Sequence, residues 1–172
     1  KESVDTVILG NGIHMIEGKQ QLADEVFKIL RPGGTFAFNT TFFDGGIPAE
    51  SEQYYRRWMS KALRALKSTH GLMPDRSKVA SRQHLSPQEY RGLLQEAGFQ
   101  IAKEDLIPVE FTLQGHEDIS EYEDFINGAL PGVPLEKASQ ILQEAARQSY
   151  EELGLTFVIR NWLQVVAMRP QS

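Results

Sequence analysis

The 172-residue sequence contains no cysteine. A disulfide framework, a cysteine-ligated zinc or iron–sulfur site and a catalytic thiol are therefore excluded. Long hydrophobic runs are also missing, because no apolar stretch approaches the roughly 20 residues that a membrane-spanning helix needs. The first residues lack the pattern of a signal peptide. We therefore expect a cytoplasmic protein with no membrane partner.

An excess of basic residues is likewise absent. The chain has 18 Lys and Arg against 23 Asp and Glu, a net charge of -5, which taken over the whole chain excludes a basic nucleic-acid binder. No Gly-x-Ser-x-Gly elbow and no P-loop occurs. The sequence also predicts no metal site, since its four histidines lack ligand spacing; they are His14, His70, His84 and His116.

The remaining composition, 41% hydrophobic and 24% charged, is that of an ordinary globular protein. Its length predicts one domain or part of a larger one. Because Lys1 stands where an initiator Met is expected, and the sequence starts almost at once with a strand-like run, we expect a fragment.

The first 43 residues predict a β-α-β unit. The apolar run over 4–9 predicts a strand buried on both faces, closed by Gly10-Asn11-Gly12. Apolar residues then recur at helical spacing over 18–30, and Pro32-Gly33-Gly34 predicts the helix end. Aromatic and β-branched residues over 35–43 predict a second, parallel strand.

Further elements follow in the second half of the chain. Ser86-Pro87-Gln88-Glu89 is a capping box with proline at the first helical position, so a helix should begin there. Strands are expected over 99–111 and 157–168. The long connections over 44–85 and 114–154 are predicted to be helical insertions.

Taken in order, these elements resemble the fourth strand onward of class I S-adenosylmethionine-dependent methyltransferases. In that family an Asp opens the fourth strand, as Asp5 does here, and a Pro-Gly-Gly turn precedes the fifth. The resemblance implies an α/β fold: a partial Rossmann-like methyltransferase sheet, mostly parallel with an antiparallel last strand, and with helical cap insertions. It implies one partial methyltransferase domain over 1–172.

The family's Gly-x-Gly-x-Gly cofactor loop is missing, so the chain resembles the C-terminal half of such an enzyme. An alternative makes Gly10-Asn11-Gly12 a phosphate-binding loop in an unrelated nucleotide-binding α/β enzyme. That interpretation needs a helix directly behind the loop and an acidic residue about 20 positions further on. Asp44 lies too far along the chain to meet this requirement.

The two insertions differ in charge. Residues 52–82 carry eight basic side chains against two acidic ones, a local balance of +6, whereas 114–154 is acidic. The basic segment would suit an acidic carrier protein or a phosphate-bearing substrate. The alternative is a solvated helix face. The basic residues are Arg56, Arg57, Lys61, Arg64, Lys67, Arg76, Lys78 and Arg82.

His14 is the candidate general base, because its ordinary pKa lies near working pH and it follows the first strand directly. The alternative is a histidine that only caps or packs. By the resemblance, S-adenosylmethionine would contact Asn11, Gly12 and Ile13. Candidate substrate-binding residues, which are otherwise turn formers or core aromatics, are Asn39, Tyr54, Tyr55, Trp58 and His84.

These predictions give two functional hypotheses. The first is methyl transfer from S-adenosylmethionine to a small-molecule or carrier-bound acceptor, with this chain as the C-terminal half of the enzyme. The second is a truncated, non-catalytic module for dimerisation or docking. In either case residues 4–9 would leave an open sheet edge, which we expect a second copy or a displaced segment to cover.

Overall fold

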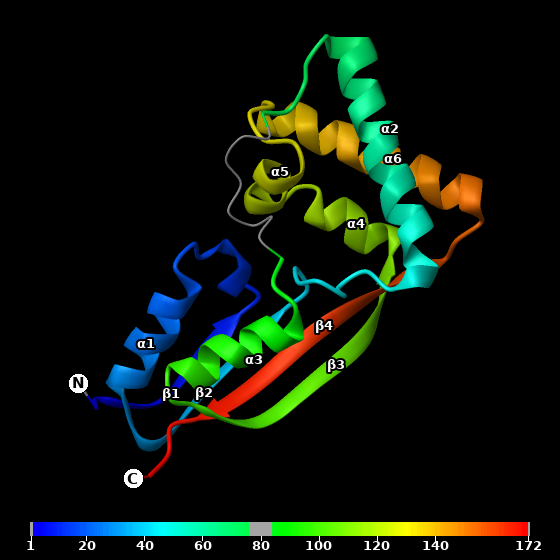
Figure 1. Ribbon diagram of the computed structural model, residues 1–172. Coiled ribbons are helices and arrows are strands. Elements are labelled where there is room, and N and C mark those ends of the chain that lie inside the picture. Colours follow the sequence, from blue (N-terminus) through cyan, green and yellow to red (C-terminus); the bar gives the residue numbers. More distant parts are fainter. Residues whose placement is uncertain (1, 76–83, 172) are drawn as a thin grey trace. The chain divides into compact units, whose positions relative to one another are not determined.

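The computed structural model describes residues 2–75 and 84–171, and in these residues it contains a four-stranded sheet and six α-helices (Figure 1). The basic residues Arg76, Lys78 and Arg82 lie outside the described residues. In chain order the strands and helices are β1 (Val4–Gly10), α1 (Lys19–Ile29), β2 (Leu30–Thr40), α2 (Glu52–His70), α3 (Pro87–Glu96), β3 (Gln100–Thr112), α4 (Leu113–Ile119), α5 (Glu123–Ala129), α6 (Leu135–Leu153) and β4 (Phe157–Met168).

The sheet has the strand order β1-β2-β4-β3. β1 and β2 are parallel, as expected for two strands joined through a helix, and β2 pairs antiparallel with β4 from Thr35 opposite Met168 to Thr40 opposite Leu163. The predicted antiparallel orientation of the last strand is therefore confirmed. The predicted α/β fold class is confirmed as well.

The Pro-Gly-Gly segment forms a bulge inside β2 rather than a turn before it. The predicted helix end is correct, because α1 stops at Ile29, but β2 begins at the next residue. Val4 pairs with Leu30 and Thr6 with Thr35, so β2 advances five residues where β1 advances two. Gly33 makes this possible with a φ of 80°.

The prediction that the first strand is buried on both faces is wrong. β1 is the end strand of the sheet in the described residues, and Ile8 is 77% exposed. Its edge position agrees with the expectation from the resemblance. Val7 and Leu9 are only partly buried, because the strand has a neighbour on one side.

The described chain divides into two compact units. Unit 1 comprises residues 1–46, 80–108 and 161–172, and unit 2 comprises 47–79 and 109–160. Two of the unit boundaries fall inside β3 and β4. The two segments of unit 2 overlap the predicted insertions over 44–85 and 114–154. A single partial methyltransferase domain stays a prediction.

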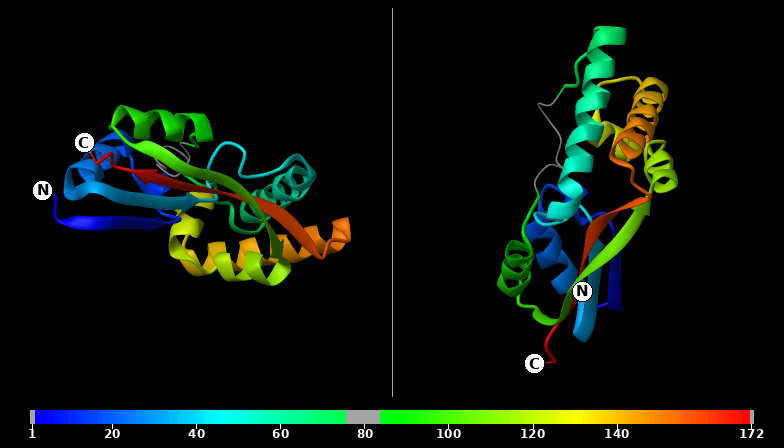
Figure 2. Two further views of the ribbon diagram at one scale, coloured as in Figure 1. Left: turned by 90° about the horizontal axis from the view of Figure 1, so that it is seen from below. Right: turned by 90° about the vertical axis from the view of Figure 1, so that its right-hand side faces the viewer.

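In unit 1, α1 and α3 cover one face of the sheet and lie side by side (Figures 1 and 2). The Gln20 side chain of α1 donates to the Leu93 carbonyl of α3 at 3.1 Å. Alternate residues of β2 and β4 point into this core, as the period of a strand requires. The predicted capping box starts α3, with Ser86 and Glu89 exchanging hydrogen bonds. Buried core residues include Phe36, Phe38, Tyr90, Leu94, Leu163 and Val165.

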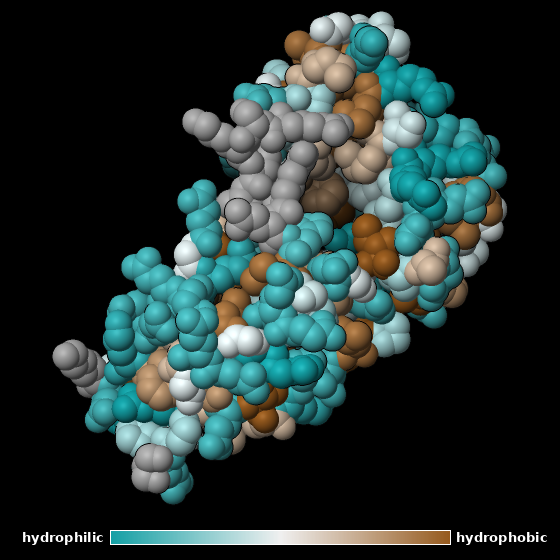
Figure 3. All heavy atoms as spheres, viewed as in Figure 1, coloured by the Kyte–Doolittle hydropathy of each residue, from teal (hydrophilic) through white to brown (hydrophobic). Residues whose placement is uncertain are grey.

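In unit 2, α2 packs along α6 (Figure 2). The indole N–H of Trp58 donates to the Leu142 carbonyl at 2.8 Å, which fixes one helix against the other. Gly71 and Gly154 end the two helices in left-handed conformations. On the face seen in Figure 3, hydrophilic side chains predominate and hydrophobic ones lie between them, since most large apolar residues belong to the two cores.

Candidate functional site

The carboxyl ends of β1 and β2 bring two predicted site residues together. The Asn11 backbone N–H donates to the Asn39 side-chain oxygen at 2.7 Å, and the Thr41 N–H donates to the Asn11 side-chain oxygen at 3.1 Å. Parallel neighbouring strands end at the same edge of a sheet, where open α/β proteins bind ligands. The segments after the two strands are therefore held together by a reciprocal pair of amide contacts.

The local backbone at this edge depends on Asn11, whose φ is 43°. Asparagine tolerates this left-handed conformation better than most residues. A short 3-10 turn over Ile13–Met15 follows, and α1 begins only at Lys19. The phosphate-loop alternative required a helix directly behind the glycines, so the structure contradicts it.

His14 is almost fully buried, with 5% of its surface exposed, beside the end of β2. Its Nδ1 lies 3.3 Å from the hydroxyl of Thr40, and its ring lies against Phe42 with centroids 4.4 Å apart. The Thr40 hydroxyl also accepts from the Phe42 N–H at 3.1 Å. The contact with Thr40 and the packing of Phe42 therefore fix the orientation of the His14 ring.

The side chains of the other predicted cofactor residues are small or buried. Ile13 packs in the core of unit 1, so only its backbone is available for polar contacts. A side chain at Gly12 would meet Leu9 at 3.3 Å, whereas Gly10 faces open space. The backbone of this turn therefore remains open to a ligand at Gly10.

Lys19 is a neighbour of this site that sequence reasoning missed. Its ammonium donates to the carbonyl of Ile16 at 2.8 Å and reaches that of His14 at 3.5 Å, and burial lowers its pKa. A lysine at the first position of a helix is electrostatically unfavourable, since the helix N-terminus is positive. This unfavourable placement of a cation was the signal in the sequence that could have pointed to Lys19.

His84 lies next to the segment that follows β2. The carbonyl of Leu85 accepts from the Asp44 N–H at 3.0 Å, and the exposed His84 directly precedes it. The structure thus places this predicted residue in unit 1 with Asn11, His14 and Asn39.

The aromatic candidates belong to unit 2 instead. Tyr54, Tyr55 and Trp58 are 1%, 8% and 2% exposed and pack in the core of that unit. Their rings surround His116, with centroids 4.8 Å from Tyr54 and 4.9 Å from Trp58. The alternative from the sequence, that these residues are core aromatics, therefore describes their packing.

His116 forms the centre of this aromatic cluster and was not singled out from the sequence. Its Nδ1 lies 3.0 Å from the Thr112 carbonyl, and its Nε2 lies 3.4 Å from the Tyr55 hydroxyl. Because the carbonyl can only accept, Nδ1 carries the proton and Nε2 accepts from Tyr55. Burial lowers the pKa of His116 to about 4, so the ring is neutral near pH 7.

Residues 2–75 and 84–171, which the structure describes, contain no group of three His, Asp or Glu side chains placed to hold a metal ion. None of their helices combines the length and apolar character needed to cross a membrane.

No protein-family model matches this chain, and no curated protein sequence matches it. Solved structures do match. A Bacillus halodurans protein assigned as a methyltransferase has 12% identity and a TM-score of 0.52, covering 98% of this chain and 71% of its own. The [4+2]-cyclase SpnF has 13% identity and a TM-score of 0.50, covering 99% of this chain and 52% of its own.

A third solved structure is phosphoethanolamine N-methyltransferase 2 of Haemonchus contortus in complex with S-adenosyl-L-methionine. It has 18% identity and a TM-score of 0.47, and the match covers 99% of this chain and 34% of that one. The chain thus spans 71% of the first matched structure, 52% of the second and 34% of the third.

The similarity at these low identities concerns the fold alone. It agrees with the α/β sheet and its antiparallel last strand, and it identifies the architecture as Rossmann-like, of the kind found in methyltransferases. The presence of a cyclase among the matches means that this fold does not by itself specify the reaction.

Proposed function

We propose that this chain is the C-terminal part of an S-adenosylmethionine-dependent methyltransferase that acts on a small-molecule or carrier-bound acceptor in the cytoplasm. The observation that carries the proposal is the convergence of Asn11, His14 and Asn39 at the carboxyl ends of β1 and β2. These residues lie at the edge of the sheet where Rossmann-like proteins bind their ligands.

The residues present fit one side of such a cofactor. Open space at Gly10 allows close approach to the backbone, and Asn11 is held in a fixed conformation by its contacts to Asn39 and Thr41. In the proposal the backbone from Asn11 to Ile13 holds the cofactor. When bound, S-adenosylmethionine supplies a methyl group activated by a sulfonium.

His14 would accept the proton of an acceptor that must lose one. Thr40 orients the ring through Nδ1, and Phe42 packs against it, so Nε2 has a defined direction. A positioned base of this kind contributes a factor of about 10²–10⁴ to a rate. An acceptor without a transferable proton would use His14 only for positioning.

On the acceptor side we propose Asn39 and His84 as polar contacts. The proposed roles of Tyr54, Tyr55 and Trp58 require their cluster to open, because these side chains are buried.

A second candidate function is supported by the exposed edge of β1. Ile8 is 77% exposed on a strand with one neighbour, and such edges pair readily with other strands. As a non-catalytic module, the chain would dimerise or dock through this edge. Sedimentation of the wild type and of Ile8→Lys tests this idea: a dimer that the substitution abolishes supports it, and a monomeric wild type contradicts it.

A calorimetric titration with S-adenosylmethionine and with its demethylated product tests the main proposal. We expect micromolar affinity, weakened by Asn11→Ala and unaffected by Lys103→Gln, an exposed residue of β3. Absence of binding, or binding that Asn11→Ala leaves unchanged, would contradict the proposed cofactor contacts.

A further inference from the structure

The exposed side of α2 carries a groove lined by basic residues. Tyr54 and Trp58 occupy the buried side of this helix, and the cations occupy the opposite side. The groove has a volume of about 560 Å³. Its lining residues are Gln53, Arg56, Arg57, Ser60, Lys61, Arg64 and Glu152.

Positive charge in this groove exceeds its negative charge. Glu152 is its one acidic lining residue, and Arg57 and Lys61 contact it at 2.8 and 2.5 Å. Arg56 pairs with Glu52 at 3.2 Å along the same helix. Arg64 has no ion pair within the described residues. These pairs are exposed, and exposed ion pairs are weak, so an acidic ligand can compete for the same cations.

Glu152 shows which anion these cations are arranged to hold. Its carboxylate projects from α6, and two cations one turn apart on α2 bind its two oxygens. Hydrogen bonds from Lys61 and Arg57 lower the pKa of Glu152, because they stabilise its charged form. The side chains of α2 therefore already bind a carboxylate presented by a neighbouring helix.

The length of the row of cations from Arg56 to Arg64 favours a helix over a small ion as the ligand of this groove. Arg56 and Arg64 are eight residues apart, which corresponds to about 12 Å along a helix. A single phosphate could contact only part of this row. Carboxylates spaced four residues apart on a second helix would match its length, because they recur on one face at nearly the same interval.

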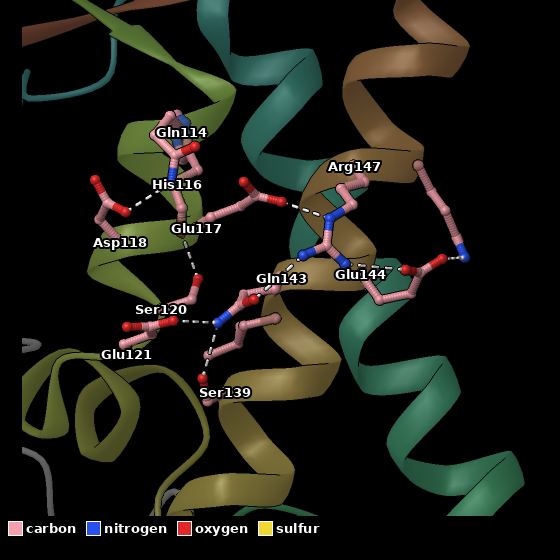
Figure 4. A network of polar contacts seen from close by, with 12 residues as sticks. Gln114, His116, Glu117, Asp118, Ser120, Glu121, Ser139, Gln143, Glu144 and Arg147 are labelled. Carbon is pink, nitrogen blue, oxygen red and sulfur yellow. Dashed lines mark hydrogen bonds and ion pairs between the residues drawn. The ribbon is translucent and has the colours of Figure 1, made fainter.

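A second copy of this chain is a poor source of that helix. On α4 and α6, its acidic residues Glu117, Asp118 and Glu144 already have partners within unit 2 (Figure 4). Arg147 binds Glu117 and Glu144, and glutamine side chains donate to Asp118 and Glu121. Docking them on another copy would require these contacts to be given up.

We propose that the groove on α2 binds an acidic helix of a partner protein. The proposal rests on charge and spacing in unit 2 and does not depend on methyl transfer. It names a docking surface and leaves the candidate site in unit 1 unchanged.

Binding of a synthetic helical peptide tests the proposal. The probe carries glutamates four residues apart on one face, and its control has the same composition with the glutamates distributed around the helix. Fluorescence anisotropy should show that the one-sided peptide binds more tightly than the control peptide. Its binding should weaken as the salt concentration increases. Arg56→Gln/Arg64→Gln should weaken it about tenfold. Lys28→Gln/Lys103→Gln, which removes the same charge elsewhere, should change it less than about twofold.

Several results would overturn the proposal. Equal binding of the two peptides, or equal effects of the two double variants, would mean that only net charge matters. Displacement of the peptide by millimolar pyrophosphate but not by millimolar acetate would assign the groove to a phosphate ligand. Tighter binding of a single-stranded oligonucleotide would assign it to nucleic acid. Self-association of the wild type that is lost in Arg56→Gln/Arg64→Gln would assign it to a second copy.

Discussion

The hydroxyl of Thr40 lies 3.3 Å from Nδ1 of His14, and both side chains are buried. Thr40 is the last residue of β2, and His14 follows β1 after a short turn. Thr40 at the end of β2 therefore fixes the ring of His14, which follows β1. This contact, with the pair between Asn11 and Asn39, defines the candidate site.

Thr40→Val should lower the free energy of unfolding by about 1–3 kcal/mol. The hydroxyl accepts from the Phe42 N–H and contacts His14, so an isosteric apolar side chain leaves both groups without this partner. Thr40→Ser keeps the hydroxyl and is the matched control. Urea denaturation measures both variants, and the contact has no energetic role if serine and valine are equally tolerated.

Asn11→Ala should be more destabilising than Asn11→Gly. Both variants lose the hydrogen bond from Thr41, but only alanine is strained at a φ of 43°, by about 1 kcal/mol. The difference between the two unfolding free energies isolates the backbone contribution. An alanine variant as stable as the glycine variant would show that the turn relaxes to an ordinary conformation.

Acid should destabilise unit 2 through His116. The pKa of this ring falls from 6.5 to about 4 on burial, so the folded state binds fewer protons than the unfolded state between these values. The contribution of the neutral His116 ring to the free energy of unfolding is complete above pH 6.5. It is lost as the pH falls toward 4, and the total loss is about 3 kcal/mol. The free energy of unfolding of His116→Gln should depend less steeply on pH across this range than that of the wild type. If the free energies of unfolding of the wild type and His116→Gln changed in parallel with pH, His116 would not be the source of this pH dependence.

Two tyrosines in the same cluster should respond in opposite ways to loss of the hydroxyl. The Tyr150 hydroxyl donates to the Phe111 carbonyl at 2.5 Å, whereas the buried Tyr54 hydroxyl has no partner in the described residues. Tyr150→Phe should cost about 1–2 kcal/mol, and Tyr54→Phe should be neutral or stabilising. Thermal unfolding compares them directly. A larger loss at Tyr54 would reveal a partner for its hydroxyl, such as a bound water.

Local patterns were sufficient for most elements of the fold. The capping box at Ser86 and the strand over 157–168 each depend on neighbouring residues, so the sequence predicts them closely. Burial of β1 was predicted wrongly because it depends on what lies beside the strand. An apolar run such as Val7 to Leu9 is the same in a central and in an edge strand.

The candidate site was predicted in part. The sequence singles out His14, Asn11 and Asn39 as separate candidates, and the structure places them at the common edge where the two parallel strands end. The partners of His116 could not be foreseen, since they come from residues far apart in the chain, such as Tyr55 and Tyr150. Lys19 was missed because its buried contacts depend on the turn that precedes α1.

The most direct test of the central claim is to follow backbone amide resonances while the demethylated cofactor product is added. We predict saturable shifts that are largest for residues 10–14 and 39–41, at the carboxyl ends of β1 and β2. Asn11→Ala should reduce the affinity measured in this titration. The account would be contradicted if saturating ligand left those amides unchanged, or if the shifts were confined to other parts of the chain.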